Sequence, residues 1–194
     1  MSRGRLAGVV VAGLLASASP ARSSGGDYVF IGGSEPARET VRAALGASSF
    51  DWDRVPHTIT IRIAGCGCAG AKPGEILLDE QVLTSTSFGA RYAWGIVQHE
   101  YAHQVAYLML DRRDRRRVIR LLGGSDWCYE VAGLPHDEHA CERFAATFAW
   151  AFWPSRRNIS RAHALLPARQ FRREVAALLA PRPSPALRGS LSDS

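Results

Sequence analysis

The stretch Gln98-His99-Glu100-Tyr101-Ala102-His103 contains the pattern H-E-x-x-H. On a helix, residues four apart lie on the same face, so the side chains of His99 and His103 point the same way. Two imidazoles placed in this way reach one zinc ion at roughly 2.0–2.1 Å. Glu100 lies about 100° further around the helix, which suits a general base better than a third ligand. The pattern predicts a zinc site with His99 and His103 as ligands and Glu100 as the catalytic base.

The sequence on both sides of this pattern is apolar. Glu100 is the only charged residue between Ala93 and Leu110. A helix that is apolar nearly all round is a buried helix. A core helix whose histidines form only structural hydrogen bonds is the alternative, but a buried Glu between two His needs partners. We therefore expect a helix over residues 87–110 that directs three polar side chains into one site.

A catalytic zinc site needs a third protein ligand and an open fourth position. In the metzincin class, that ligand is a His six residues after the second His, but Met109 occupies this position here. Glu142 is the better candidate. Apolar residues follow it at helical spacing, namely Ala145, Phe148, Ala149 and Phe152. Small side chains among them allow two helices to approach closely, so we predict that a helix over residues 137–153 brings Glu142 to the zinc.

Other polar side chains lie close to Glu142 in the sequence. His139 is three residues before Glu142 and shares its helix face, so it is an alternative ligand. His136, His139 and Tyr129 are candidates to donate hydrogen bonds to the oxyanion of a tetrahedral intermediate. The segment that contains His136 and Asp137 also suits the first turn of a helix. We favour this structural role for both residues.

These motifs together resemble the ImmA/IrrE-type zinc peptidases, which are gluzincins. The resemblance rests on H-E-x-x-H followed by E-x-x-A-x-x-F-A and a proline, here Glu142, Ala145, Phe148, Ala149 and Pro154. The segment 74–78 is similar to the family's strand before the active-site helix, so the similarity covers roughly residues 74–154. The family often has Asn where this chain has Ala146.

The resemblance implies a small zincin-like domain and a peptidase activity. Its zinc ion would be held by His99, His103 and Glu142, and Glu100 would move protons during hydrolysis of a peptide or protein substrate. We expect the substrate backbone to pair with an edge strand around residues 76–78. A secreted zinc-binding interaction module without catalytic activity is the alternative function.

The chain has four cysteines, Cys66, Cys68, Cys128 and Cys141. An even number of cysteines in an exported protein predicts two disulfides. A bridge from Cys66 to Cys68 closes a very tight ring, so we expect bridges between the Cys66/Cys68 loop and the region of Cys128 and Cys141, with the partners left open. A structural zinc ion on the four thiolates is the alternative.

The N-terminus has the layout of a secretory signal peptide over residues 1–21. Arg3 and Arg5 precede an uncharged run from Leu6 to Ala18, and small residues follow. The run is short for a membrane span, so we expect a secreted or extracytoplasmic protein without a transmembrane helix after cleavage. An uncleaved N-terminal membrane anchor is the alternative.

Without the expected signal peptide, the chain has about 173 residues, which suits one α+β domain over residues 27–180. Residues 58–63 alternate with period two and predict a strand beside the zinc-motif helix, and residues 76–78 predict a second strand. Further helices are expected over residues 34–45, 111–122 and 170–179, so the domain is mostly helical. Residues 181–194 are rich in Pro and Ser and predict a disordered tail.

The net charge of the chain is +6, and the run of residues 111–117 is its densest group of charges. An Arg-rich module that binds an anionic polymer is therefore a further alternative function. Asp111 and Asp114 interrupt the run, which favours a solvated helix face. No aromatic residues alternate with these arginines, which argues against a nucleic acid as partner.

Overall fold

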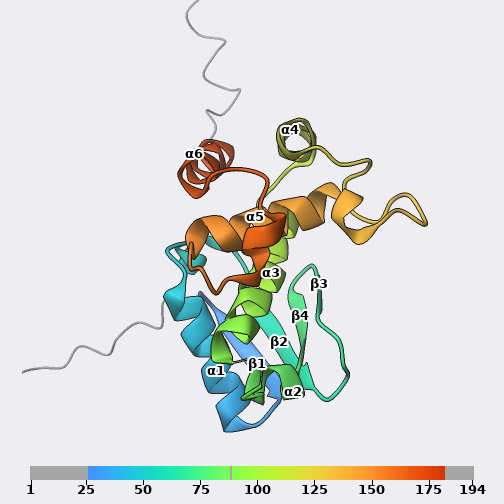
Figure 1. The fold of residues 1–194 in the computed structure, drawn as a ribbon. Coiled ribbons are helices and arrows are strands. Elements are labelled where there is room, and N and C mark those ends of the chain that lie inside the picture. The colour runs from blue at the N-terminus through green and yellow to red at the C-terminus, as the bar shows by residue number, and fades with distance from the viewer. Residues whose placement is uncertain (1–25, 88, 182–194) are drawn as a thin grey trace, which may run out of the picture.

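The computed structural model describes residues 26–87 and 89–181. The expected signal peptide and nearly all of the expected disordered tail lie outside these residues. The described chain is α+β, as predicted, with six α-helices and one four-stranded mixed sheet (Figure 1). None of its helices is both long and apolar enough to cross a membrane.

The sheet has the strand order β1-β2-β4-β3. Its strands are β1 (Tyr28–Gly32), β2 (Ile59–Ala64), β3 (Gly70–Lys72) and β4 (Glu75–Asp79). β2 runs parallel to both β1 and β4, whereas β3 pairs with β4 in the antiparallel sense. The period-two pattern of β2 has its predicted effect, because every second side chain is buried: Ile59, Ile61 and Ile63.

Two strands were not predicted, and this changes the edge of the sheet. β1 is a short apolar run that carries no clear periodicity, and β3 follows shortly after Cys68 in a segment that was expected to form the Cys66/Cys68 loop. Gly74, with φ +79°, makes the turn between β3 and β4 in a conformation that favours glycine. The expectation that residues 76–78 form an edge strand is therefore wrong, because β4 lies between β2 and β3.

Five of the helices follow the predicted order with shifted ends, whereas the short helix α2 was not predicted. They are α1 (Glu35–Ala47), α2 (Glu80–Thr84), α3 (Ala90–Leu108), α4 (Arg112–Leu122), α5 (Ala140–Phe152) and α6 (Ala168–Leu178). α5 begins three residues later than predicted, because residues 136–138 form a separate 3₁₀ turn and His139 has an extended backbone. Another 3₁₀ turn, Ile159–His163, lies against both α3 and α5.

α3 crosses the molecule between the sheet and α5 (Figure 1). Small residues with no solvent exposure lie on both helices, which allows their backbones to approach: Ala102, Ala106, Ala145 and Ala149. An aromatic cluster packs against both helices. Phe50 lies edge-on to Phe148 of α5 and Trp52 edge-on to Tyr101 of α3, each with 4.9 Å between ring centroids. This packing determines which face of α3 points toward the N-terminal half of α5, where the polar side chains meet.

Candidate metal centre

α3 presents His99 and His103 toward α5, one helical turn apart. Their Nε2 atoms are 3.3 Å apart, and His103 is only 3 % exposed. As predicted, nearly the whole of α3 from Ala93 onward is buried or half-buried. The apolar sequence around the motif therefore explains the burial, and the helical period explains the common direction of the two imidazoles.

Glu142 reaches the same point from the first turn of α5. Its Oε2 lies 3.0 Å from Nε2 of His99 and 3.2 Å from Nε2 of His103. The three candidate ligand atoms all lie within 4.8 Å of one another. Burial raises the pKa of Glu142, but hydrogen bonds and charge from His103 and His99 outweigh it, so the pKa falls well below its usual range. Two imidazole nitrogens and one ionised carboxylate are a donor set that zinc accepts, so these residues fit the ion.

Glu100 lies beside this group without joining it. It is 8 % exposed, and burial raises its pKa to about 7. The Glu142 carboxylate adds to this rise, whereas His99 opposes it. A buried carboxyl group with a pKa near neutrality suits proton transfer at physiological pH.

Three further polar residues from the sequence predictions lie on the segment before α5. Nε2 of His136 is 3.0 Å from Oε2 of Glu142, and its Nδ1 is 2.6 Å from the hydroxyl of Tyr129. His136 is therefore at the centre, not merely in a helix cap. His139 is elsewhere: its Nδ1 is 2.6 Å from Oδ1 of Asp126, and it is not among the residues that converge with Glu142.

The pair of Asp126 and His139 closes the base of the loop that carries Tyr129 and His136. Both side chains are buried. Oδ2 of Asp126 also accepts the amides of Glu130 at 2.7 Å and Val131 at 2.9 Å. Burial raises the pKa of Asp126, but the hydrogen bonds from His139 and from these amides outweigh it and lower the pKa below its usual value.

Replacing Asp126 by Ala is expected to lower the free energy of unfolding by about 3 kcal/mol, because it leaves His139 and two amides without their partner. The lowered pKa fixes the sign of the pH dependence. The contribution is present above the unfolded Asp pKa of about 3.9 and is lost as the pH falls through the lower folded value. Urea unfolding at pH 7 and at acidic pH measures both effects. The exposed control Asp51→Ala should change stability by less than about 0.5 kcal/mol, and an equally small loss for Asp126→Ala contradicts the assignment.

The predicted number of disulfides is correct, but the predicted pairing is wrong. Cys66 is bonded to Cys68, and Cys128 to Cys141, with Cα separations of 5.2 and 5.3 Å. Gly67, with φ +61°, reverses the chain between the first pair. Oδ2 of Asp79 holds this turn by accepting the amides of Cys66 and Gly67. Both bridges are therefore local, and the sulfur atoms are not available as a four-thiolate zinc site.

Gln104 is a site-positioning residue that the sequence analysis missed. It has no solvent exposure, and its Oε1 accepts the amide of Gly74 at 2.8 Å. Its Nε2 donates to the carbonyl of Lys72 at 2.9 Å. The side chain next to His103 in the sequence thus ties α3 to the β3–β4 turn. An uncharged polar residue inside an apolar helix was the available signal.

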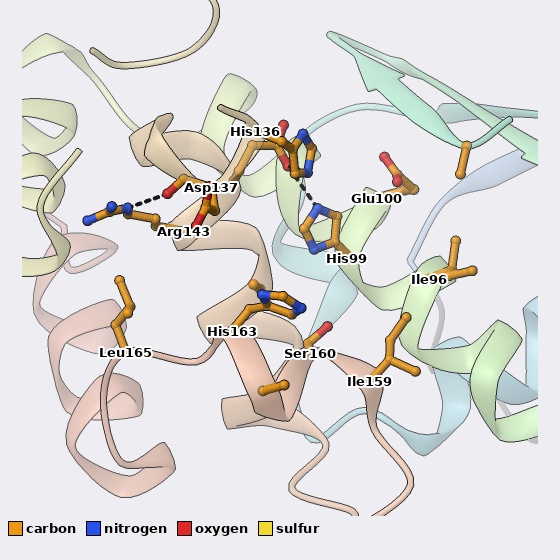
Figure 2. A pocket seen from close by; sticks show the side chains of 14 residues that line it. Ile96, His99, Glu100, His136, Asp137, Arg143, Ile159, Ser160, His163 and Leu165 are labelled. Carbon is orange, nitrogen blue, oxygen red and sulfur yellow. Dashed lines mark hydrogen bonds and ion pairs between the residues drawn. The ribbon is translucent and has the colours of Figure 1, made fainter. Parts of the chain in front are cut away.

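A cavity of about 610 Å³ opens beside the centre (Figure 2). Its lining includes the centre itself, with His99, Glu100, His136 and Glu142. The rest of the lining mixes polar side chains with apolar ones, and the apolar residues include Ile96, Ala146, Ile159, Ala162 and Leu165. Figure 2 shows Ile159, Ser160 and His163 on the wall opposite His136, and Ile96 beside Glu100. Apolar side chains therefore lie next to the polar centre.

Comparison with known proteins identifies no relative of this chain. No family model, no curated protein and no solved structure matches the chain. The functional argument therefore rests on the residues of the centre and the cavity beside it.

Proposed function

We propose that this protein is a zinc-dependent peptidase of the small gluzincin type, with His99, His103 and Glu142 as the zinc ligands. The observation that carries the proposal is the meeting of three ligand atoms next to a buried carboxyl group, Glu100, that is not one of them. A helix bearing H-E-x-x-H, a second helix bearing Glu and a small sheet beside them support a zincin-like domain. Bound zinc supplies Lewis acidity, which polarises a carbonyl group and lowers the pKa of a coordinated water molecule.

Glu100 moves the protons in this proposal. Its carboxylate accepts a proton from the attacking water and then delivers it to the leaving amine. The side chain lines the cavity beside His99, so it can reach a substrate that lies across the centre. Its burial favours the protonated form, which helps the group to hold the proton between the two transfers.

His136 is the proposed hydrogen-bond donor to the oxyanion, and Tyr129 orients it. Partial desolvation and the charge of Glu142 raise the pKa of Tyr129, so its hydroxyl keeps its proton at neutral pH. When this hydroxyl donates a hydrogen bond to Nδ1 of His136, the neutral imidazole carries its hydrogen on the other ring nitrogen, Nε2, which can then donate it. That Nε2 atom faces Glu142 and the cavity, where the carbonyl oxygen of a bound peptide would lie.

The substrate that fits is an extended peptide with a large apolar side chain. That side chain would lie in the cavity against Ile96, Ala146 and Ile159. β3 is an outer strand of the sheet, and Ala69, directly before it, lines the cavity. The peptide backbone would therefore pair with β3 rather than with β4.

Replacing Ala146, which lines the cavity, by Phe is expected to fill part of it. We expect kcat/KM for peptides with a large apolar residue at the fitting position to fall by about 10- to 200-fold, as typical for hydrophobic pockets, with a smaller loss for Gly or Ala there. Steady-state kinetics on a matched peptide series measures the difference. Ala177→Phe, on an exposed position of α6, is the control. Equal losses on all peptides would place the side-chain site elsewhere.

The proposed setting is outside the cytoplasm, where disulfides persist. Two disulfides in the described chain fit such a compartment. The basic test of the function is reversible metal dependence. Peptide cleavage should disappear after removal of the metal by a chelator and return on addition of one equivalent of zinc. Cleavage that survives complete metal removal contradicts the proposal.

A further inference from the structure

The disulfide between Cys128 and Cys141 lies directly beside the metal centre. Oε2 of Glu142 faces the two histidines, whereas its Oε1 lies 3.9 Å from Sγ of Cys141. The two sulfur atoms and a carboxylate oxygen of Glu142 lie within 4.8 Å of one another, which is close enough to hold a metal ion together. Glu142 thus stands between two groups of candidate ligands, one of nitrogen and one of sulfur.

We propose that reduction of Cys128–Cys141 closes the metal centre, an inference that rests on the proposed zinc site. A sulfur atom in a disulfide is not the thiolate that binds a metal. Once released, the two thiols are soft ligands that zinc accepts readily. With one of the two sulfur atoms bound beside His99, His103 and Glu142, the ion has the four protein ligands of a structural site and loses the open position that hydrolysis requires.

The redox step is an ordinary thiol–disulfide exchange. A thiolate of an external dithiol attacks Sγ of Cys128, which is half-buried, and the thiolate of the fully buried Cys141 leaves and takes up a proton. The second thiol of the reagent then displaces Cys128. The dithiol becomes a disulfide, and the protein gains two electrons and two protons. The thiol whose sulfur binds the metal gives its proton to solvent.

The fold keeps the two sulfur atoms near Glu142 after the bridge is cut. The amide of Cys141 donates to the carbonyl of Trp127 at 2.8 Å, and the amide of Ala140 donates to the carbonyl of Asp126 at 3.1 Å. The hydrogen bond between the buried side chains of Asp126 and His139 also joins the segment before Cys128 to the segment before Cys141. These contacts flank both cysteines and do not depend on the S–S bond.

The second disulfide provides a matched control within the chain. Cys66 is exposed, and neither Cys66 nor Cys68 belongs to a group that can hold a metal within residues 26–87 and 89–181. Reduction of this bridge should therefore leave the metal centre open. The double variant Cys66→Ser/Cys68→Ser retains only the bridge beside Glu142, and Cys128→Ser/Cys141→Ser retains only the distant one.

Cobalt(II) absorption spectroscopy tests the inference. Metal-free protein, oxidised or reduced anaerobically with a phosphine that is then removed, is titrated with cobalt(II). The reduced wild type and the reduced Cys66→Ser/Cys68→Ser variant should show the near-ultraviolet sulfur-to-cobalt charge-transfer band and bind cobalt at least 10-fold more tightly than their oxidised forms. Reduced Cys128→Ser/Cys141→Ser should show no such band and no change in affinity.

The outcomes separate this inference from the proposed zinc site. One cobalt per chain in the oxidised protein, with no sulfur band after reduction, overturns the inference and leaves the zinc site standing. Loss of the band in reduced Cys66→Ser/Cys68→Ser also overturns it, because the band would then arise from the distant cysteines. The inference is also overturned if circular dichroism shows that the protein unfolds on reduction. Failure of the oxidised protein to bind cobalt contradicts the proposed zinc site itself.

Discussion

Glu100→Gln is expected to lower kcat by about 10²- to 10⁴-fold, which is the contribution that general acid–base catalysis supplies. Gln keeps the size and hydrogen bonding of the side chain, but it cannot take up the proton of the attacking water. Because Glu100 is not among the three converging ligands, the variant should bind one zinc ion with unchanged affinity. Its thermal stability should stay close to that of the wild type, since removal of a buried carboxyl group also removes a desolvation cost.

Steady-state kinetics and elemental analysis of the same sample measure this result. Glu130→Gln makes the same chemical change on an exposed residue of the neighbouring loop and should leave kcat within twofold of the wild type. Full activity in Glu100→Gln would place the base elsewhere. Loss of zinc together with activity would make Glu100 a ligand.

Glu142→Ala is expected to weaken zinc binding by more than 100-fold. Loss of an outer-shell partner typically costs 10- to 100-fold in metal affinity, and Glu142 contacts both histidines directly. The two imidazoles that remain make a poor site by themselves. Competition with a chromophoric chelator measures the affinity, and activity should fall in parallel.

Two variants serve as controls for Glu142. Asp137→Ala removes an exposed carboxylate from the lining of the same cavity and should retain tight zinc binding. His139→Ala should destabilise the protein through Asp126 and still bind one zinc ion at low temperature. Tight binding in Glu142→Ala together with loss of zinc in His139→Ala would reverse the ligand assignment.

The parts of this structure that could be predicted follow from local periodicity. The helical spacing of His99 and His103 sets their common direction, and the small and apolar residues after Glu142 indicate that a second helix packs closely on the first. The alternation of β2 likewise follows from its own residues. Each of these features depends on side chains within a few turns of the chain, so the sequence pattern is sufficient.

The parts that could not be predicted depend on contacts between distant segments or on single turns. β3 forms because β4 offers it a partner and Gln104 holds the turn between them. Asp114 interrupts the basic run, which suggested a solvated position, yet it is buried in a capping box with Asp111. The bridge between Cys66 and Cys68 depends on a chain reversal at Gly67, a conformation that no periodic pattern records.

Hydrolysis of a peptide library in H₂¹⁸O tests the central claim most directly. The library should contain large apolar residues at varied positions, and the wild type should be loaded with one equivalent of zinc. Mass spectrometry is predicted to detect new fragments whose C-terminal carboxylates carry one ¹⁸O atom, with cleavage sites clustered around the apolar residues. Metal-free protein and zinc-loaded Glu100→Gln should produce far fewer fragments. A library that remains intact with the zinc-loaded wild type would contradict the account and favour a zinc-binding module without catalytic activity.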